Sequence, residues 1–434
     1  MRSIIISVGD ELVSGQTVDT NSAWMSQRLA AAGCAVQAHI VVADDQQAIE
    51  QAIRRCAGEC DVLIISGGIG PTPDDLTRQA LAGVLGQPLE MNESWLRRLE
   101  DFFRQRRRPM PEMNRIQAMI PRGAELIENC CGTAAGIHAV LPGGCHVFVL
   151  PGVPKEMSAM FEQAVLPFVR QRAGGAVVLL RALHTFGPGE SAIAEMLGSA
   201  LLDRRRNPLV GTTVSGGVVT VRIYSRHASA DEARRQMEDT AALCRRALGD
   251  LIFGEDDRTL PQAVADLLRE HALARRYAPA VCTAESCTGG LVAKYLTDVP
   301  GSSAFFRQGW VTYSNEAKVR ELNVPPEIIE RHGAVSEQTA CAMALGAARR
   351  SGAVFALALS GIAGPDGGTP QKPVGMVCIA LASPAHGEPA HEPQLRVQAR
   401  TFYLPGDRET VRDRAAKMAL TMLRYRLLEK DMPF

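Results

Sequence analysis

The first part of the chain alternates short runs of β-branched residues with segments whose apolar residues recur at helical spacing. The strand-like runs are Ile4–Val8, Ala35–Val42 and Val62–Ser66, and the helical spacing covers Asn21–Ala32 and Asp45–Cys56. Parallel strands need a crossover connection between them, and a helix is the usual one. The pattern therefore predicts βαβ units and a mostly parallel sheet.

The middle of the chain has a different pattern of apolar and polar positions. Strand-like and helical segments alternate there, but the runs are less uniformly apolar than in the first part. The expected strands and helices are Val177–His184, Glu190–Leu202, Val218–Ser225 and Asp231–Leu248. We interpret this stretch as a small α+β module that ends in a linker at Gly254–Asp257.

Alternating strands and helices return in the last part of the chain. The expected elements are Leu260–Leu273, Ala280–Ala284, Leu291–Leu296, Val354–Ser360, Val374–Ala382 and Thr410–Leu428. Residues 383–393 are expected to form a solvated hairpin loop. The whole pattern predicts an α/β protein with three domains, at residues 1–170, 171–256 and 257–434.

The charged, apolar and cysteine residues of the chain indicate which partners and which cellular compartment to expect. The chain holds 47 basic and 47 acidic residues, so net charge favours neither nucleic acid nor an anionic membrane as a partner. No stretch approaches the ~20 apolar residues of a membrane helix. The eleven cysteines are scattered, and the adjacent pair Cys130-Cys131 has poor geometry for a disulfide. We expect a reduced, cytoplasmic protein, and a homodimer because paired copies are the commonest assembly.

The turn Thr283-Ala-Glu-Ser-Cys-Thr-Gly-Gly290 joins an expected strand to an expected helix. This placement predicts that Ser286 and the N–H groups after it lie at a helix N-terminus, which stabilises an oxyanion. Gly289 and Gly290 would let a substrate approach the backbone closely. A serine hydroxyl is a weak nucleophile and needs a base. The surroundings are not a Gly-x-Ser-x-Gly elbow, so a Ser-His-Asp triad is not indicated.

Lysine is the alternative base for Ser286, if burial or nearby positive charge lowers its pKa. Lys294 lies further along the expected helix, and Tyr313 and Lys318 lie in Val311-Thr-Tyr-Ser-Asn-Glu-Ala-Lys318. Both lysines are equally consistent with solvent-exposed positions. We interpret Cys287 as a small neighbour of the serine and not as the nucleophile.

A second glycine-rich segment, Ser360-Gly-Ile-Ala-Gly-Pro-Asp-Gly-Gly368, directly follows an expected strand. Such a loop offers several N–H groups to a phosphate. One pair of glycines after a strand is usually only a turn. Two such loops in the same domain favour a binding site.

These motifs resemble the C-terminal domain of the competence/damage-inducible protein family CinA, which is similar to stand-alone nicotinamide-mononucleotide amidohydrolases. Gly301-Ser-Ser303, Gly333-Ala-Val-Ser336 and Lys372-Pro-Val-Gly375 also match, in order. The resemblance implies hydrolysis of nicotinamide mononucleotide to nicotinic acid mononucleotide and ammonia, without a cofactor. It implies Ser286 as the nucleophile, with Lys294, Tyr313 and Lys318 as candidates for activating it. The candidate substrate-binding residues are Glu285, Thr288, Gly289, Gly290, Gly361, Ile362, Ala363, Gly364 and Asp366.

Acidic residues and glycines also gather after two expected strands of the first domain. The segments are Ser7-Val-Gly-Asp-Glu-Leu-Val-Ser-Gly15 and Ser66-Gly-Gly-Ile-Gly-Pro-Thr-Pro-Asp-Asp75. Ligands of open parallel sheets bind beyond the carboxyl ends of the strands. Carboxylates and a glycine loop at that edge suit a phosphate held partly through a divalent cation. The alternative is that Asp74 and Asp75 only cap the helix that follows them.

These segments resemble the molybdopterin-binding MoaB/MogA-like domain, in the version found at the start of CinA proteins. Asp19-Thr-Asn21, Pro121-Arg-Gly123, Gly132-Thr-Ala-Ala-Gly136 and Leu150–Met157 match as well. The resemblance implies cleavage of the pyrophosphate of ADP-ribose, with a divalent ion (Mg, Mn or Co) and an AMP product. The candidate metal ligands are Asp10, Asp75 and Glu156, and the candidate substrate-binding residues are Gly9, Asn21, Gly67, Gly68, Gly70 and Asp74.

The middle module resembles the KH-like domain of full-length CinA proteins. A nucleic-acid-binding KH domain needs a Gly-x-x-Gly clamp, which neither Gly187-Pro-Gly189 nor Gly211–Gly217 supplies. A structural or dimer-forming role is therefore favoured, and nucleic acid is not an expected partner.

Two classes of function are consistent with these patterns. The first is a hydrolase of pyridine-nucleotide recycling, with nicotinamide mononucleotide and ADP-ribose as its small-molecule partners. The second is a regulatory protein that binds a nucleotide or a molybdopterin without turnover. Ammonia release that disappears in Ser286→Ala would distinguish the first class from the second.

Overall fold

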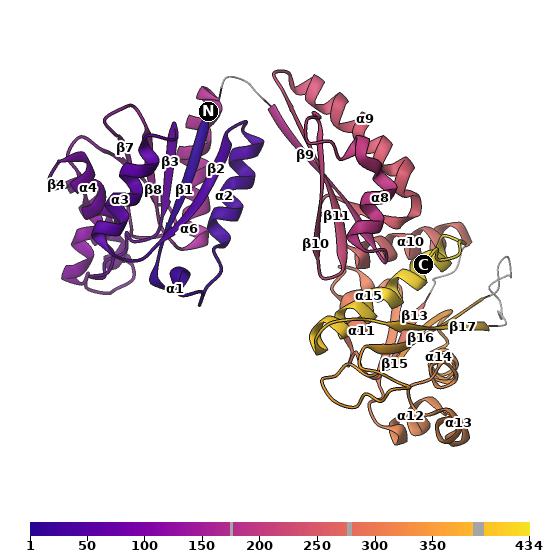
Figure 1. Ribbon diagram of the computed structural model, residues 1–434. Coiled ribbons are helices and arrows are strands. Elements are labelled where there is room, and N and C mark those ends of the chain that lie inside the picture. Colours follow the sequence, from indigo (N-terminus) through magenta and orange to yellow (C-terminus); the bar gives the residue numbers. More distant parts are fainter. Residues whose placement is uncertain (174–176, 276–279, 385–394) are drawn as a thin grey trace. The chain divides into compact units, whose positions relative to one another are not determined.

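The structure is a computed structural model that describes residues 1–173, 177–275, 280–384 and 395–434 (Figure 1). Contacts between residues divide the chain into two compact units. The first contains residues 1–180 and 224–238, and the second contains residues 181–223 and 239–434. The loop expected at 383–393 begins inside a strand, and its part from residue 385 lies outside the described residues.

The first unit is built on a six-stranded sheet with the order β2-β1-β3-β8-β7-β6. The first four of these strands are parallel, as the alternation of strands and helices predicts. β7 runs antiparallel to β8, and β6 runs antiparallel to β7. The strands are β1 (Arg2–Val8), β2 (Ala35–Val42), β3 (Val62–Ser66), β6 (Glu125–Ile127), β7 (Gly136–Val140) and β8 (His146–Leu150).

Helices cover both faces of this sheet, because alternate residues of β1 point to opposite sides. Ile4 and Ile6 pack with α3 (Gln46–Ala57) and α4 (Thr77–Leu85). Ile5 packs on the other face with α2 (Thr20–Ala31), α6 (Pro154–Met160) and α7 (Leu166–Arg172). The smaller elements of this unit are α1 (Asp10–Val13), β4 (Leu89–Met91), α5 (Glu93–Gln105) and β5 (Met119–Pro121).

The middle module contains a four-stranded sheet with the order β10-β11-β9-β12. The sequence interpretation assigned no element to β10, which is joined to its neighbour β11 by a turn at Gly216 and Gly217. The linker expected at Gly254–Asp257 is wrong in its first half, since Gly254 pairs with His184 of β9. The elements are β9 (Val177–Phe186), α8 (Glu190–Leu201), β10 (Leu209–Ser215), β11 (Val218–His227), α9 (Ala230–Leu248) and β12 (Ile252–Glu255).

The C-terminal sheet has the order β14-β13-β15-β16-β17. Its first three strands are parallel, and β16 and β17 are antiparallel additions. The sequence pattern missed β14 and β17, because both are edge strands whose residues are mostly exposed or half-buried and lack a continuous apolar run. The strands are β13 (Val281–Glu285), β14 (Phe306–Val311), β15 (Phe355–Gly361), β16 (Met376–Pro384) and β17 (Leu395–Tyr403).

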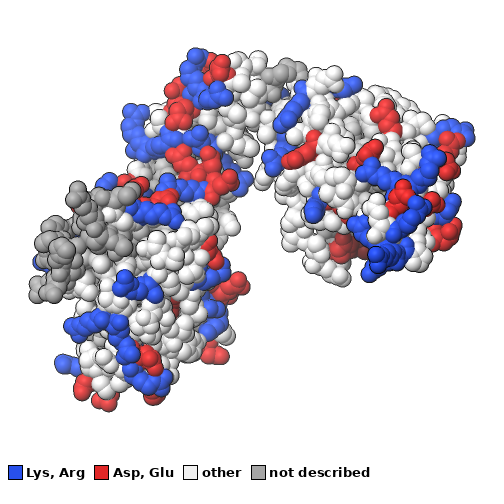
Figure 2. All heavy atoms as spheres, turned by 180° about the vertical axis from the view of Figure 1, so that it is seen from behind, with Lys and Arg blue, Asp and Glu red and all other residues white. Residues whose placement is uncertain are grey.

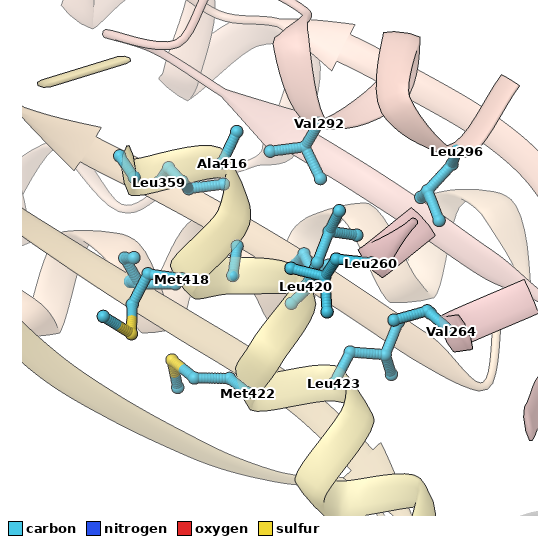
Figure 3. Close-up of a cluster of buried hydrophobic side chains, with 14 of the residues drawn as sticks. Leu260, Val264, Val292, Leu296, Leu359, Ala416, Met418, Leu420, Met422 and Leu423 are labelled. Carbon is cyan, nitrogen blue, oxygen red and sulfur yellow. The ribbon is translucent and has the colours of Figure 1, made fainter. Parts of the chain in front are cut away.

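Two groups of helices enclose this sheet. One face is covered by α10 (Leu260–Arg275), α11 (Leu291–Thr297) and α15 (Arg408–Leu427), and Figure 3 shows their buried side chains meeting around Leu420. The other face carries α12 (Asn315–Leu322), α13 (Pro326–His332) and the alanine-rich α14 (Glu337–Ser351). The catalytic candidates of the C-terminal domain therefore belong to loops and helices that are anchored in a three-layer core.

The surface charges are mixed, and the cysteines are unpaired. On the face shown in Figure 2, blue and red side chains lie interspersed over both parts of the chain. No helix in the described part of the chain combines the length and the apolar character that a membrane crossing requires. All eleven cysteines are free thiols, and eight of them are buried.

Candidate active sites

Parallel strands bring the C-terminal motifs to one edge of the sheet. Glu285, the last residue of β13, lies beside Val311 of β14 and Leu359 of β15. The residues that follow these three strands are therefore neighbours, although they are far apart in sequence. They carry Ser286, the segment that leads to Lys318, and the second glycine-rich loop.

Lys318 is the lysine that faces Ser286. Its Nζ lies 3.1 Å from the Ser286 Oγ, 2.9 Å from the carbonyl oxygen of Thr312 and 3.4 Å from that of Tyr313. A neutral amine has two N–H bonds and one lone pair. If the two N–H bonds point to the two carbonyls, the lone pair is left to accept a proton from Ser286.

Burial sets the charge of this lysine. The Lys318 side chain is 1% exposed, and burial lowers its pKa because a charged ammonium is poorly solvated there. Cys287 and Glu316 act weakly in the opposite direction. Burial also raises the pKa of the neighbouring Cys287 thiol to about 12, so the thiolate that a cysteine nucleophile needs is disfavoured.

Three amides at the N-terminus of α11 already have an acceptor, which corrects the expectation that this helix end is free to stabilise an oxyanion. The fully buried carboxylate of Glu285 accepts hydrogen bonds from the N–H groups of Gly290, Val292 and Ala293, at 2.8–3.0 Å. These are the first amides of α11, whose partial positive charge favours a carboxylate. Glu285, expected to bind substrate, instead holds the turn that carries Ser286.

Lys294 and Tyr313 do not contact Ser286. The Lys294 side chain is 60% exposed and forms an ion pair with Asp298 one helical turn away. The Tyr313 side chain is also 60% exposed, and its hydroxyl accepts a hydrogen bond of 2.9 Å from Arg408. Of the three candidates for activating Ser286, the structure brings only Lys318 to it.

Two arginines of α15, which the sequence interpretation missed, hold the active-site loops. Arg408 donates to the Gly364 carbonyl at 2.8 Å as well as to Tyr313, and Arg412 donates to the Thr288 carbonyl at 2.9 Å. They are four residues apart, so they project from the same face of the helix. The signal for Arg408 was a cation at the first position of a helix, where the dipole disfavours it.

The second glycine-rich loop offers fewer free amides than the sequence suggested. The N–H of Ile362 donates to the Met376 carbonyl, and the Ile362 carbonyl accepts from Gly375. Ala363 is buried, whereas Asp366 is exposed at the tip of the loop. In the first loop, the Thr288 hydroxyl is buried and has no hydrogen-bond partner among the described residues.

The N-terminal motifs line a cavity of about 450 Å³ at the carboxyl ends of β1, β3 and β8. Gly67 follows β3 with φ +109, and a Cβ there would lie 2.3 Å from the Val8 carbonyl, so only glycine fits. Among the described residues, five carboxylates but no lysine, arginine or histidine line the cavity. The acidic residues are Glu11, Asp44, Asp74, Asp75 and Glu156, and the lining also includes the predicted Gly9, Gly67, Gly68 and Gly70.

Asp44 at the end of β2 is an acidic residue that sequence reasoning missed. Burial raises its pKa, and the negative charges of Asp10, Glu11 and Asp74 add to this effect. Asp10, which does not line the cavity, exchanges hydrogen bonds with Asp44 through both backbone amides, at 2.9 and 3.2 Å. The acidic pair Asp44-Asp45 after a predicted strand was the available signal, because Asp45 caps α3 and leaves Asp44 at the edge.

Other predicted residues of the N-terminal site form hydrogen bonds that hold the surrounding loops in place. Asp75 does not cap α4 but accepts hydrogen bonds from the amides of Gly70 and Thr72, at 2.6 and 2.8 Å. Asn21 donates to the Gly152 carbonyl, and Glu156 accepts from Asn129 at 2.6 Å. The described residues contain no group of three His, Cys, Asp or Glu side chains arranged to hold a metal ion. Asp10, Asp75 and Glu156 therefore do not form a preformed metal cage.

Three family models match successive parts of the chain. They are the "CinA C-terminal domain" at residues 259–427, the "Probable molybdopterin binding domain" at residues 4–171 and the "Damage-inducible protein CinA KH domain" at residues 180–254. A CinA-like protein of Geobacter sulfurreducens is 44% identical over 430 residues, which cover 99% of this chain and 100% of that protein. The chain belongs to the CinA family. The expected three-domain organisation of that family is confirmed, whereas the exact domain boundaries stay a prediction.

Other CinA proteins match either the whole chain or one part of it. A CinA-like protein of Dictyoglomus thermophilum is 40% identical over 429 residues, covering 99% of this chain and 100% of that protein. Among solved structures, the competence/damage inducible protein CihA of Agrobacterium tumefaciens is 40% identical, with a TM-score of 0.33. It covers 38% of this chain and 93% of that one.

Proposed function

We propose that the C-terminal domain is an amidohydrolase that converts nicotinamide mononucleotide to nicotinic acid mononucleotide and ammonia. The observation that carries this proposal is the buried Lys318 amine 3.1 Å from the Ser286 hydroxyl. A lysine whose pKa is lowered by burial can act as a general base for a serine nucleophile. The choice of substrate comes from the family to which the chain belongs.

The proposed reaction proceeds through an acyl-enzyme. Lys318 takes the proton of Ser286 while the serine oxygen attacks the carboxamide carbon of the substrate. The C–N bond then breaks, and the leaving nitrogen receives a proton from Lys318 and departs as ammonia. Lys318 next deprotonates a water molecule, which attacks the ester and releases the carboxylate product with the regenerated serine. Glu285 and Arg412 position the turn of Ser286 through their hydrogen bonds to its backbone and to α11.

Ammonia release from nicotinamide mononucleotide by the full chain tests this proposal. Ser286→Ala should lower kcat by at least ~10³-fold, because removal of a catalytic nucleophile typically costs that much or more. The matched control is Cys287→Ala, which removes the adjacent thiol and should retain most of the activity. Ammonia release that survives in Ser286→Ala, or that is lost in Cys287→Ala, would contradict the assignment.

For the N-terminal domain we propose metal-dependent cleavage of ADP-ribose. The supporting observation is a cavity with five carboxylates and no lining cation, at the carboxyl edge of a parallel sheet. Such a cavity suits a divalent ion, because magnesium is usually held by one or two carboxylates together with substrate phosphates and water. We expect the lining carboxylates, Asp44 and Glu156 among them, to hold the ion directly or through bound water, and the ion would neutralise the pyrophosphate charge.

A chelator distinguishes the two proposed activities. EDTA should abolish AMP formation from ADP-ribose and leave ammonia release unchanged. Asp44→Asn keeps an oxygen for the Asp10 amide but removes the charge, and it should raise the metal concentration needed for half-maximal cleavage. Tight binding of ADP-ribose or a molybdopterin without turnover, under every divalent ion tried, would instead favour a regulatory binding module.

A further inference from the structure

Two adjacent exposed cysteines lie in the loop that holds Glu156 of the N-terminal cavity. The sulfur atoms of Cys130 and Cys131 are 3.5 Å apart, and both residues are exposed. The other cysteines of the chain are buried or half-buried. Thiols react with oxidants only when the oxidant can reach them, so this exposed pair is the most accessible thiol site of the chain.

The loop of these cysteines is organised by one buried asparagine. The Asn129 side chain is 2% exposed, and its Oδ1 accepts hydrogen bonds of 2.9 Å from the amides of Cys131 and Gly132. Its Nδ2 donates to the Ala134 carbonyl at 3.0 Å and to the Glu156 carboxylate at 2.6 Å. The backbone of Cys131 and the carboxylate of Glu156 are therefore joined through a single side chain.

Gly132 gives a second link between the loop and the carboxylate. A Cβ on Gly132 would lie 2.1 Å from a carboxylate oxygen of Glu156, so this carboxylate packs directly against the glycine backbone. Residues 133 and 134 of the same loop and Glu156 itself line the cavity. A change in the backbone at residues 130–132 can therefore act on Glu156 both through Asn129 and through Gly132.

A disulfide between adjacent residues would impose such a change. The Cα atoms of neighbouring residues are ~3.8 Å apart. Unstrained disulfides span Cα separations of ~4.4–6.8 Å, and deviations make the bond easier to reduce. Closure of the eight-membered ring would thus distort the peptide between Cys130 and Cys131, whose N–H is bound to Asn129. The same strain would keep the bridge reversible by thiols.

We propose that Cys130 and Cys131 are a reversible oxidation site for hydroperoxides, which loosens Glu156 when it closes. A Cys130 thiolate attacks hydrogen peroxide, breaks the O–O bond and becomes a sulfenic acid as hydroxide leaves. The Cys131 sulfur then attacks the sulfenyl sulfur, the S–O bond breaks and water departs. In sum, two thiols and one hydrogen peroxide yield one disulfide and two water molecules.

The first test follows the chemistry and does not depend on any activity. The full chain is treated with hydrogen peroxide, and the mass of the peptide that contains both cysteines is measured by mass spectrometry. We expect it to lose two hydrogen atoms and to recover them with dithiothreitol. The amides of Cys131 and Gly132 should exchange hydrogen faster in the oxidised protein, because they have lost Asn129. Oxygen addition without bridging, a disulfide between chains, or unchanged exchange would overturn the inference.

The second test concerns the cavity and rests on the proposed cleavage of ADP-ribose. Peroxide should lower this cleavage several-fold in the wild type, leave ammonia release unchanged, and have no effect on cleavage by Cys130→Ser. Cys341→Ser, which removes the half-buried thiol of α14, is the matched control and should respond as the wild type does. Cleavage by the wild type that persists after complete bridging would overturn the link to Glu156. If reduced wild type cleaves no ADP-ribose, the proposed function fails, while mass and exchange still decide the oxidation site.

Discussion

Replacement of Lys318 by methionine isolates the role of the amine. Methionine has a similar length and volume, so the buried position stays filled. The hydrogen bonds of Nζ to Thr312 and Tyr313 are lost, and an unsatisfied buried acceptor costs ~1–3 kcal/mol. Removal of a poorly solvated amine offsets part of this cost. The net change is therefore smaller than the ~5–15 kcal/mol that stabilises a typical domain, and we expect the variant to fold.

Loss of a general base lowers a rate by ~10²–10⁴-fold. At ~1.36 kcal/mol for each factor of ten, this corresponds to about 3–5 kcal/mol of transition-state stabilisation. We expect Lys318→Met to lower kcat for ammonia release by this factor. Because Lys318 acts only through Ser286 in the proposed reaction, the double variant Ser286→Ala/Lys318→Met should be no slower than Ser286→Ala alone.

The matched control is Lys294→Met, which makes the same substitution at an exposed lysine paired with Asp298. It should retain the wild-type rate to within about twofold, because surface ion pairs contribute little. Ammonia release would be measured in a coupled assay, with thermal unfolding recorded for every variant. A folded Lys318→Met protein with a near wild-type rate would refute the base assignment. So would a double variant in which the two losses multiply.

The proposed reaction requires a neutral Lys318 amine. The value of kcat/KM for ammonia release should therefore rise with pH through the pKa of Lys318, which burial lowers below the ~10.4 of a free lysine. A pH profile that stays flat from pH 6 to ~10 would contradict this prediction. Glu285→Gln replaces the carboxylate that accepts from the N–H groups of α11 with a neutral amide. The free energy of unfolding, measured with urea, should fall by ~1–3 kcal/mol, and ammonia release should be slower. Leu420→Ala opens a cavity in the buried core shown in Figure 3, and it should lower the free energy of unfolding in urea by ~2–5 kcal/mol. A decrease below ~1 kcal/mol would mean that the surrounding side chains collapse into the space.

Local sequence patterns were sufficient for several features of this protein. The runs at Ile4–Val8 and Val62–Ser66 are strands because β-branched residues that are buried on both faces leave a continuous apolar signal. The motif around Ser286 indicated a nucleophile, since it combines a serine, glycines and a strand end. The ordered motifs also indicated the CinA family, which the relatives confirm.

Contacts between distant residues decided what the sequence left open. The sequence alone does not distinguish Lys294 from Lys318 as the base. The parallel pairing of β13 with β14 is what brings Lys318 to Ser286. Glu285 could have faced a substrate, but its burial beneath α11 turns it toward the helix amides. Residue types and their spacing determine which chemistry is present in the chain. Burial and strand order determine which groups meet, because desolvation and hydrogen bonding depend on neighbours that are remote in sequence.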